Sequence, residues 1–148
     1  MIRFSRTLPI ALALLCTVAT HAAPPTHPAG NGKMVLVGLS GLEDVQRMTA
    51  PLRHAAMLKR ESKLKEIVVV LYGRAVAALN SRAPGVPEEA RKQLDAARQA
   101  GVHVFACEHS LEQLGIPLEA LPAGVEHVPH GIFKIAELVG EGYAPMQY

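Results

Sequence analysis

The sequence predicts an α/β sandwich built on a mainly parallel sheet, and three observations lead to that prediction. Strand-like and helix-like segments alternate along the chain, as they do where a helix connects each strand to the next. The run "EIVVVLYG" at residues 66–73 lacks polar alternation, which indicates a strand buried on both faces. The helix that opens at Pro87 carries Glu88 and Glu89 in its first turn and ends before Gly101, an arrangement that helix termini favour.

The amino-terminal residues predict an exported protein. Residues 1–22 combine a basic start, the apolar stretch Leu8–Thr20 and small residues before Ala23, which are the features of a cleaved secretory signal. The apolar stretch is 13 residues long. A membrane-spanning helix needs about 20 residues, so no membrane anchor is expected after cleavage. In a double-membrane cell the mature protein would be periplasmic.

The mature chain is predicted to be one domain over residues 33–148, behind a flexible lead-in at residues 23–32 that is rich in proline and glycine. Loss of the two signal arginines leaves equal numbers of basic and acidic residues. Nucleic-acid binding requires a concentrated basic face, so no nucleic-acid partner is expected. Cys107 becomes the only cysteine, because Cys16 lies in the signal, and an internal disulfide is therefore excluded.

The first half of the domain is expected to supply two strands. Lys33–Leu39 is an apolar run that ends at a Ser-Gly turn, and a helical pattern of apolar residues follows over Val45–Leu64. Pro51 lies inside that pattern and is expected to split it into a short lead-in and a main helix. The second strand, Glu66–Gly73, leads into a short helix over Arg74–Asn80.

The second half continues the alternation. The helix that opens at Pro87 is followed by the strand Val102–Ala106. Ser110 and Gln113 fit a capping box, which predicts a helix that begins at Leu111. The last three elements are an edge strand of alternating polarity, an amphipathic helix and a terminal strand, over residues 124–128, 131–142 and 143–148.

Cys107 is the residue that points most directly to a function. It follows a predicted strand, and parallel α/β sheets bind ligands beyond the carboxyl ends of their strands. A thiol ahead of a helix meets free backbone N–H groups and the positive end of the helix dipole, which favour the thiolate. The same position also fits a small buried core residue, the common environment of a free cysteine.

Three other side chains are expected in the same set of loops. His109 could protonate a leaving sulfur, and His130 could bind an anion together with the helix that follows it. Arg74, in the loop after the second strand, could also contact an anion. We treat all three as supporting candidates, because each also fits an ordinary loop position.

Two alternatives remain open from the residues alone. Cys107, His109 and His130, with His127 as a further candidate, would form a set of nitrogen and sulfur ligands suited to copper or zinc. Their spacing lacks the paired pattern of zinc motifs, so the primary prediction includes no metal. The other alternative is an oligomeric binding module whose thiol is inert. No cofactor is expected, since "GLSG" after the first strand lacks the third glycine of a dinucleotide fingerprint.

Three stretches, "EIVVVLYGRAVAAL", "GVHVFACEHSLEQLGI" and "GVEHVPHGIFKIAELVGEGYAPMQY", resemble the DsrE/DsrF-like family, which includes sulfur-relay subunits and YchN-like proteins. The resemblance covers about Lys33–Tyr148. It implies a three-layer α/β/α sandwich with a mainly parallel five-stranded sheet, assembled into homo-trimers or hexamers. In the sulfur-relay members, a cysteine that matches Cys107 accepts sulfur as a persulfide and passes it on. The resemblance therefore implies a sulfur carrier, at most sulfurtransferase-like, whose sulfur donor and acceptor the sequence does not name.

Overall fold

One parallel sheet forms the centre of the molecule. The structure is a computed structural model and describes residues 32–80 and 83–148. Within these residues the sheet has five strands: β1 (Lys33–Gly38), β2 (Glu66–Leu71), β3 (His103–Cys107), β4 (Glu126–Val128) and β5 (Ala144–Gln147). Their order is β4-β3-β2-β1-β5, and each recorded pairing is parallel. The predicted parallel sheet is therefore confirmed, and β4 is an edge strand, as its alternating polarity predicted.

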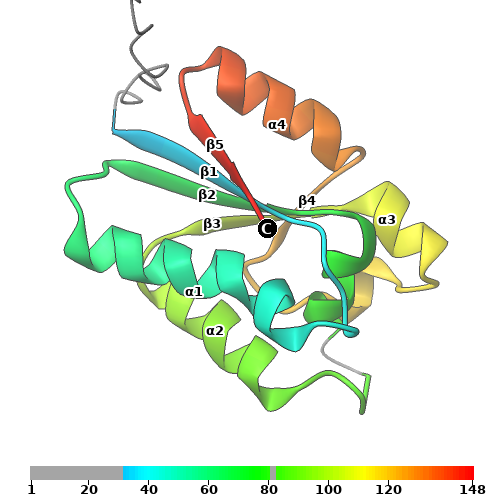
Figure 1. Ribbon diagram of the computed structural model, residues 1–148. Coiled ribbons are helices and arrows are strands. Elements are labelled where there is room, and N and C mark those ends of the chain that lie inside the picture. Colours follow the sequence, from blue (N-terminus) through cyan, green and yellow to red (C-terminus); the bar gives the residue numbers. More distant parts are fainter. Residues whose placement is uncertain (1–31, 81–82) are drawn as a thin grey trace, which may run out of the picture.

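Helices cover the two faces of the sheet unequally. On one face lie α1 (Val45–Glu61) and α2 (Glu88–Gln99), whereas α4 (Gly131–Gly140) lies on the other (Figure 1). The larger core cluster packs alternate strand residues such as Leu36 against α1 and α2. A smaller cluster packs the intervening strand residues against Leu138 of α4. The predicted three-layer sandwich is confirmed, and its α4 layer is the thinner one.

The first long helix, α1, runs without a break through Pro51, so the predicted split at this residue is wrong. Asp44 caps the helix, because its Oδ1 accepts a hydrogen bond from the backbone N–H of Arg47 at 3.0 Å. Pro51 is buried and packs against Gly38 of β1. A proline inside a helix costs about 3 kcal/mol. Burial of this turn against the sheet offsets that cost.

The helix after β3, α3 (Glu108–Gln113), begins earlier than the predicted start at Leu111, so the capping-box prediction is wrong. Ser110 lies inside the helix, and its hydroxyl accepts a hydrogen bond from the backbone N–H of Gly73 at 2.8 Å. Cys107 is itself the N-cap residue of α3. The serine pattern was misleading because a partner distant in sequence takes the hydroxyl that a local cap would have used.

The remaining connections are short. The helix expected after β2 is a 3₁₀ helix, η1 (Gly73–Leu79), and a second 3₁₀ turn, η2 (Leu118–Ala120), follows α3. Gly73 starts η1 with a φ of 60°, a left-handed conformation that glycine adopts at little cost.

The predicted signal at residues 1–22 lies outside the described residues, as does the lead-in at residues 23–32 except for Gly32. Across the two described ranges, no helix has the length and apolar character that crossing a membrane requires.

Candidate functional site

Cys107 is the last residue of β3, at the carboxyl end of the sheet, as the sequence predicted. It pairs with Val128 of β4, and β2 is the neighbour of β3 on the other side. The cysteine is only 4% exposed. Its Sγ lies 3.9 Å from the carbonyl oxygen of Pro129, a long contact even for a thiol donor. The thiol is therefore buried in the larger core cluster, and its contact with Pro129 is a weak one.

The start of α4 covers Cys107. A Cβ atom placed on Gly131 would lie 3.2 Å from Cβ of Cys107 and 2.9 Å from Cβ of Tyr72. Any larger residue would have to push the helix away from the ends of β2 and β3. Glycine at this position thus allows the first turn of α4 to pack directly on the cysteine. Sequence reasoning did not identify Gly131, although a glycine in the first turn of an amphipathic helix was a signal of close packing.

Two helix N-termini meet at the thiol. Cys107 caps α3 without a side-chain hydrogen bond, and His130 caps α4 in the same way. The backbone N–H of His109 donates to the carbonyl of Pro129 at 3.2 Å, which ties the two helix starts together. Helix N-termini present backbone N–H groups and the positive end of the dipole. Anionic groups bind readily at such termini.

His109 and His130 lie together at the surface above the cysteine. Both residues are exposed, and their ring centroids are 5.6 Å apart with a tilt of 57° between the planes. The ring of His130 also meets the edge of Phe133 at 5.2 Å. The structure thus brings two of the three predicted supporting residues together, next to the residues that enclose Cys107.

Glu108 and His127 pair with each other at the same end of the sheet. Oε1 of Glu108 lies 2.5 Å from Nδ1 of His127, so the carboxylate has a partner other than the thiol. Within residues 32–80 and 83–148, no group of three or more His, Cys, Asp or Glu side chains is placed to hold a metal ion. The structure therefore does not assemble the Cys/His ligand set of the metal alternative.

Arg74 follows Gly73 but extends toward a different loop. Its guanidinium pairs with Oε1 of Glu43 at 3.0 Å, and the arginine side chain is 71% exposed. A hydrogen bond from the backbone N–H of Gly41 and, as a smaller effect, the charge of Arg74 lower the pKa of Glu43. Arg74 is thus held by the connection between β1 and α1, and its role as an anion contact stays a prediction.

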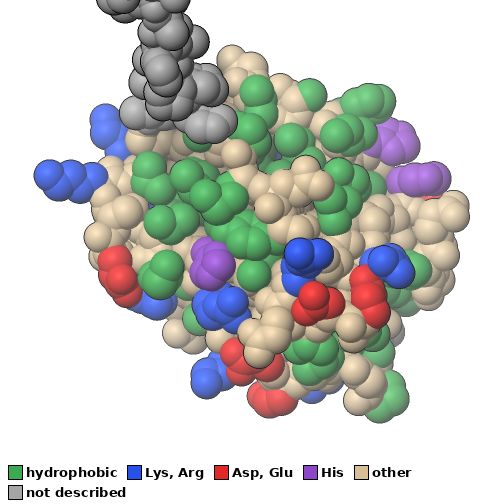
Figure 2. All heavy atoms as spheres, viewed as in Figure 1, with side chains coloured by type: hydrophobic (Ala, Val, Ile, Leu, Met, Phe, Trp, Pro, Cys, Tyr) green, Lys and Arg blue, Asp and Glu red, His purple; other side chains and the backbone are tan. Residues whose placement is uncertain are grey.

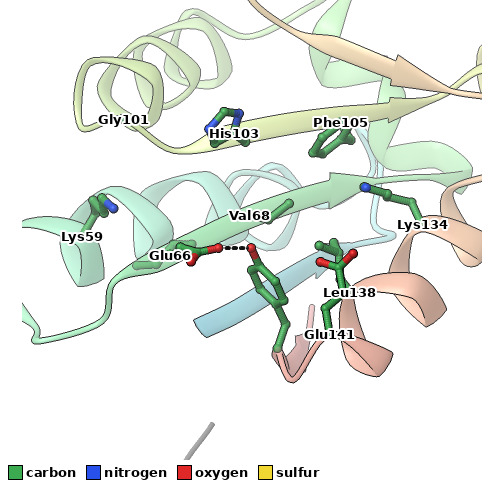
Figure 3. A pocket seen from close by; sticks show the side chains of 11 residues that line it. Lys59, Glu66, Val68, Gly101, His103, Phe105, Lys134, Leu138 and Glu141 are labelled. Carbon is green, nitrogen blue, oxygen red and sulfur yellow. Dashed lines mark hydrogen bonds between the residues drawn. The ribbon is translucent and has the colours of Figure 1, made fainter. Parts of the chain in front are cut away.

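A pocket of about 360 Å³ lies on the α4 side of the sheet, away from Cys107 (Figure 3). It is lined by the first residues of β2 and β3, whereas Cys107 is the last residue of β3. Inside it, the hydroxyl of Tyr143 donates to the carboxylate of Glu66, which also pairs with Lys33 at 3.3 Å. The hydrogen bond to Glu66 and burial raise the pKa of Tyr143 to about 12. These contacts tie the start of β2 to the residues before β5.

Comparisons with known proteins agree with this architecture. Three solved structures are similar. MTH1491 from Methanobacterium thermoautotrophicum, described as a protein of unknown function, is 22% identical with a TM-score of 0.66, and the match covers 78% of this chain and 99% of that chain. The YchN protein of E. coli is 23% identical with a TM-score of 0.64, and the match covers 78% of this chain and 98% of that chain. BT1422 from Bacteroides thetaiotaomicron, also of unknown function, is 17% identical with a TM-score of 0.63, and the match covers 80% of this chain and 96% of that chain. At these identities the similarity shows the fold alone. No curated protein matches the chain significantly. The model of the DsrE/DsrF-like family matches residues 32–148.

Proposed function

This chain belongs to the DsrE/DsrF-like family, and we propose that it carries sulfur as a persulfide on Cys107. The observation that carries the proposal is the position of the thiol, at the carboxyl end of β3 where the N-termini of two helices meet. Ligand sites in parallel α/β sheets form at this end. Cys107 is also the only free cysteine of the described residues, so bound sulfur must leave to another molecule.

Loading begins with the thiolate of Cys107 and an anionic donor that contains a sulfane sulfur. The thiol first loses its proton to solvent or to His109. The thiolate then attacks the sulfane sulfur, the donor's bond to that sulfur breaks, and its electron pair stays with the leaving group. With thiosulfate the leaving group is sulfite, and with a polysulfide it is the shortened polysulfide. No external oxidant or reductant is needed, because the sulfur–sulfur bond of the persulfide replaces the sulfur–sulfur bond of the donor.

Unloading is the reverse chemistry with a different thiol. The thiolate of an acceptor attacks the terminal sulfur of the persulfide, the bond to Cys107 breaks, and its thiolate is regenerated. Backbone N–H groups at helix N-termini favour bound anions, so the starts of α3 and α4 suit an anionic sulfur donor.

His109 and His130 have supporting roles in this proposal. Both are exposed beside the Pro129–Gly131 segment that covers the thiol, where an imidazole can accept the thiol proton or interact with an anionic donor once that segment has shifted. We assign proton transfer to His109, because it lies in the first turn of α3, two residues after Cys107, and donor binding to His130, at the start of α4. Arg74 has no assigned role in this cycle, because its guanidinium is already paired with the carboxylate of Glu43.

The burial of Cys107 places a condition on the proposal. With 4% of the residue exposed, the segment Pro129–Gly131 must shift before a donor can reach Sγ. Both Pro129 and His130 are exposed, and the N-terminus of α4 has no side-chain cap to hold it in place. This segment is therefore the part of the site that we expect to open.

The same burial favours a second candidate function, an oligomeric binding module in which Cys107 is an inert core residue. The two candidates differ in one measurement: the alkylation rate of the thiol in the folded protein. A carrier reacts with iodoacetamide while folded, at a rate that depends on opening of the Pro129–Gly131 segment. An inert core thiol reacts only when the whole protein unfolds, so its rate follows global unfolding as denaturant is added.

We also propose where the protein acts and in what form. The predicted signal at residues 1–22 would deliver the domain to the periplasm, where its sulfur donor and acceptor would have to be found. The family resemblance suggests a homo-oligomer, a trimer or a hexamer. The exposed side of an outer helix is the surface we expect to form the contact.

A further inference from the structure

The pocket on the α4 side of the sheet takes no part in the sulfur chemistry proposed above, yet it has the size and lining of a ligand site. Its volume of about 360 Å³ lies within the range of roughly 300–1,000 Å³ typical of small-molecule pockets. Figure 3 shows His103 and Phe105 on β3 across from Leu138 and Glu141 on α4, with Val68 of β2 between them. Val68 and Leu138 are both buried, so the floor of the pocket is apolar and its rim is polar.

The pocket lies on the inward side of α4. Ile132 and Phe133 are exposed on the outward side, and Figure 2 shows hydrophobic side chains gathered over the region where Figure 1 places this helix. Lys134, Leu138 and Glu141 line the pocket instead, and their spacing of four and three residues puts them on one face of the helix, toward the sheet. Charge and apolar surface are therefore combined on the inward side alone.

The carboxylate of Glu66, at the start of β2, is already satisfied. Hydrogen bonds from Tyr143 and Lys33 and, as a smaller effect, the charge of Lys59 lower the pKa of Glu66. Lys33 pairs with this carboxylate at 3.3 Å, and the ammonium of Lys59 also donates to the backbone carbonyl of Lys65 at 2.6 Å. These groups balance one another without a ligand.

Glu141 differs from the other charged groups of the lining. Lys134 pairs with Glu137 at 3.1 Å, whereas Glu141 takes part in no ion pair within residues 32–80 and 83–148. The hydrogen bond to Glu66, burial and, as a smaller effect, the charge of Glu141 raise the pKa of Tyr143 to about 12. Glu141 therefore lies near the Tyr143 hydroxyl and leaves one negative charge in the pocket without an ionic partner from the described chain.

The position of Glu141 is unfavourable for the helix itself. Glu141 is the C-cap residue of α4, and the last turn of this helix contains no basic residue. Helix C-termini carry the negative end of the dipole and favour cations. A carboxylate that opposes this preference without a compensating contact is a mark of a functional position. The side chain and the helix end together make this part of the pocket attractive to a cation.

The opposite wall of the pocket adds a hydrogen-bond acceptor and an aromatic ring. Nδ1 of His103 lies 2.9 Å from Oε1 of Glu126. When the Nδ1 proton is donated to that carboxylate, Nε2 of the neutral ring is an acceptor. The ring of Phe105 already has the ammonium of Lys134 over it, 5.1 Å from its centroid. This wall thus suits a group that donates hydrogen bonds and carries an apolar stem.

We propose that this pocket binds a small organic cation, a primary ammonium group joined to an apolar stem. The ammonium pairs with Glu141 and donates to Nε2 of His103, while the stem packs on Val68 and Leu138. Lys134 precedes Glu141 by seven residues along α4, about 10 Å, so this lysine lies at the other end of the pocket. The site is independent of the sulfur proposal, because His103 and Cys107 are at opposite ends of β3.

Three probes with the same phenethyl stem and different charge test the proposal: phenethylammonium, phenethyl alcohol and hydrocinnamate. Each is titrated into the purified protein, and two-dimensional NMR follows the backbone amides of Gly101 and Phe105, which line the pocket. Phenethylammonium should bind with a dissociation constant in about the millimolar range, as expected for so small a ligand. The alcohol should bind about five-fold more weakly, the loss expected for one partly exposed ion pair, and the carboxylate more weakly still.

Two results with these probes would overturn the proposal. If hydrocinnamate binds more tightly than phenethylammonium, Lys59 and Lys134 determine the specificity and the pocket is an anion site. If phenethylammonium shifts neither amide at concentrations of tens of millimolar, the pocket does not bind this class of ligand.

Glu141→Gln isolates the carboxylate, because it removes the charge and keeps the shape of the side chain. It should weaken phenethylammonium binding about five-fold and leave the alcohol unaffected. The matched control is Glu112→Gln, which changes an exposed carboxylate of α3 outside the pocket and should alter neither affinity. Unchanged affinity in a folded Glu141→Gln protein, or equal weakening by both substitutions, would contradict the proposal. Sulfur loading of Cys107 should be the same in both variants, so failure here leaves the sulfur-carrier proposal standing.

Discussion

Gly131 approaches Cys107 so closely that a Cβ atom on the glycine would lie 3.2 Å from Cβ of the cysteine. This contact joins the first turn of α4 to the end of β3, two segments that are separated in sequence by α3, η2 and β4. It explains how a thiol at the functional end of the sheet can be buried. It also makes the position of α4 the factor that controls access to sulfur.

Gly131→Ala should therefore act on stability and on thiol access together. The added methyl group would lie 2.9 Å from Cβ of Tyr72, so α4 has to shift outward. We expect a loss of about 1–3 kcal/mol in the free energy of unfolding, the usual cost of overpacking. The folded variant should also be alkylated faster at Cys107. Gly85→Ala, where a Cβ meets no neighbour within 4 Å, is the control and should change neither quantity appreciably.

Ser110→Ala tests the link between α3 and the loop after β2. Removing the hydroxyl leaves the N–H of Gly73 without its recorded partner, which should lower the free energy of unfolding by about 1 kcal/mol. If Ser110 were instead a helix cap in a capping box, Gln113→Ala would be destabilising too. Because α3 begins at Glu108, we expect Gln113→Ala to change stability by less than about 0.5 kcal/mol. Chemical denaturation of both variants decides between the two roles.

The outcome for Ser110 shows where sequence reasoning stops. Strand positions and the fold class follow from apolar runs and local helix signals, which act over a few residues and were correct. The capping box failed because the hydroxyl finds Gly73 through the fold, 37 residues away. The predicted break of α1 at Pro51 failed for the same kind of reason. The burial of Pro51 against Gly38 depends on tertiary packing, which local rules do not include.

The candidate site was predictable in position but not in detail. The rule that parallel sheets bind ligands at their carboxyl end correctly located Cys107 there, with His109 in the first turn of α3 beside His130 at the start of α4. Spacing alone could not show that Gly131 covers the thiol, because that contact depends on the angle of α4. It could not show either that Arg74 would pair with Glu43.

The pair formed by Tyr143 and Glu66 predicts a pH dependence of stability. The hydrogen bond from Tyr143 lowers the pKa of Glu66 and, in return, raises the pKa of Tyr143 to about 12. The carboxylate's contribution is present above its ordinary pKa of about 4.3 and is lost as the pH falls through its lowered value. The tyrosine's contribution is present below its ordinary pKa of about 10 and is lost as the pH rises toward 12.

Tyr143→Phe isolates this effect. The difference in unfolding free energy between the wild type and the variant should be largest between about pH 5 and pH 9, and should shrink toward both extremes. Denaturation curves measured across this range provide the test. A difference that stays constant from acid to alkaline pH would mean that the tyrosine contributes packing only.

Export is tested by the mass of the mature protein. Expressed from its full sequence in a double-membrane cell, the protein should be recovered from the periplasmic fraction with Ala23 as its first residue. Replacing Ala22 with a bulky residue such as Tyr should block cleavage and leave residues 1–22 attached. Soluble cytoplasmic protein that retains Met1 would show that the segment is not a signal.

The most direct test of the central claim is intact-mass measurement of the folded protein after incubation with thiosulfate or polysulfide. We expect the wild type to gain the mass of one sulfur atom, and to lose it again when a reducing thiol is added as acceptor. Cys107→Ser, with the same fold and assembly, should gain nothing. A folded wild-type protein whose mass does not change, or a Cys107→Ser variant that gains the same mass, would contradict the proposal that Cys107 carries sulfur.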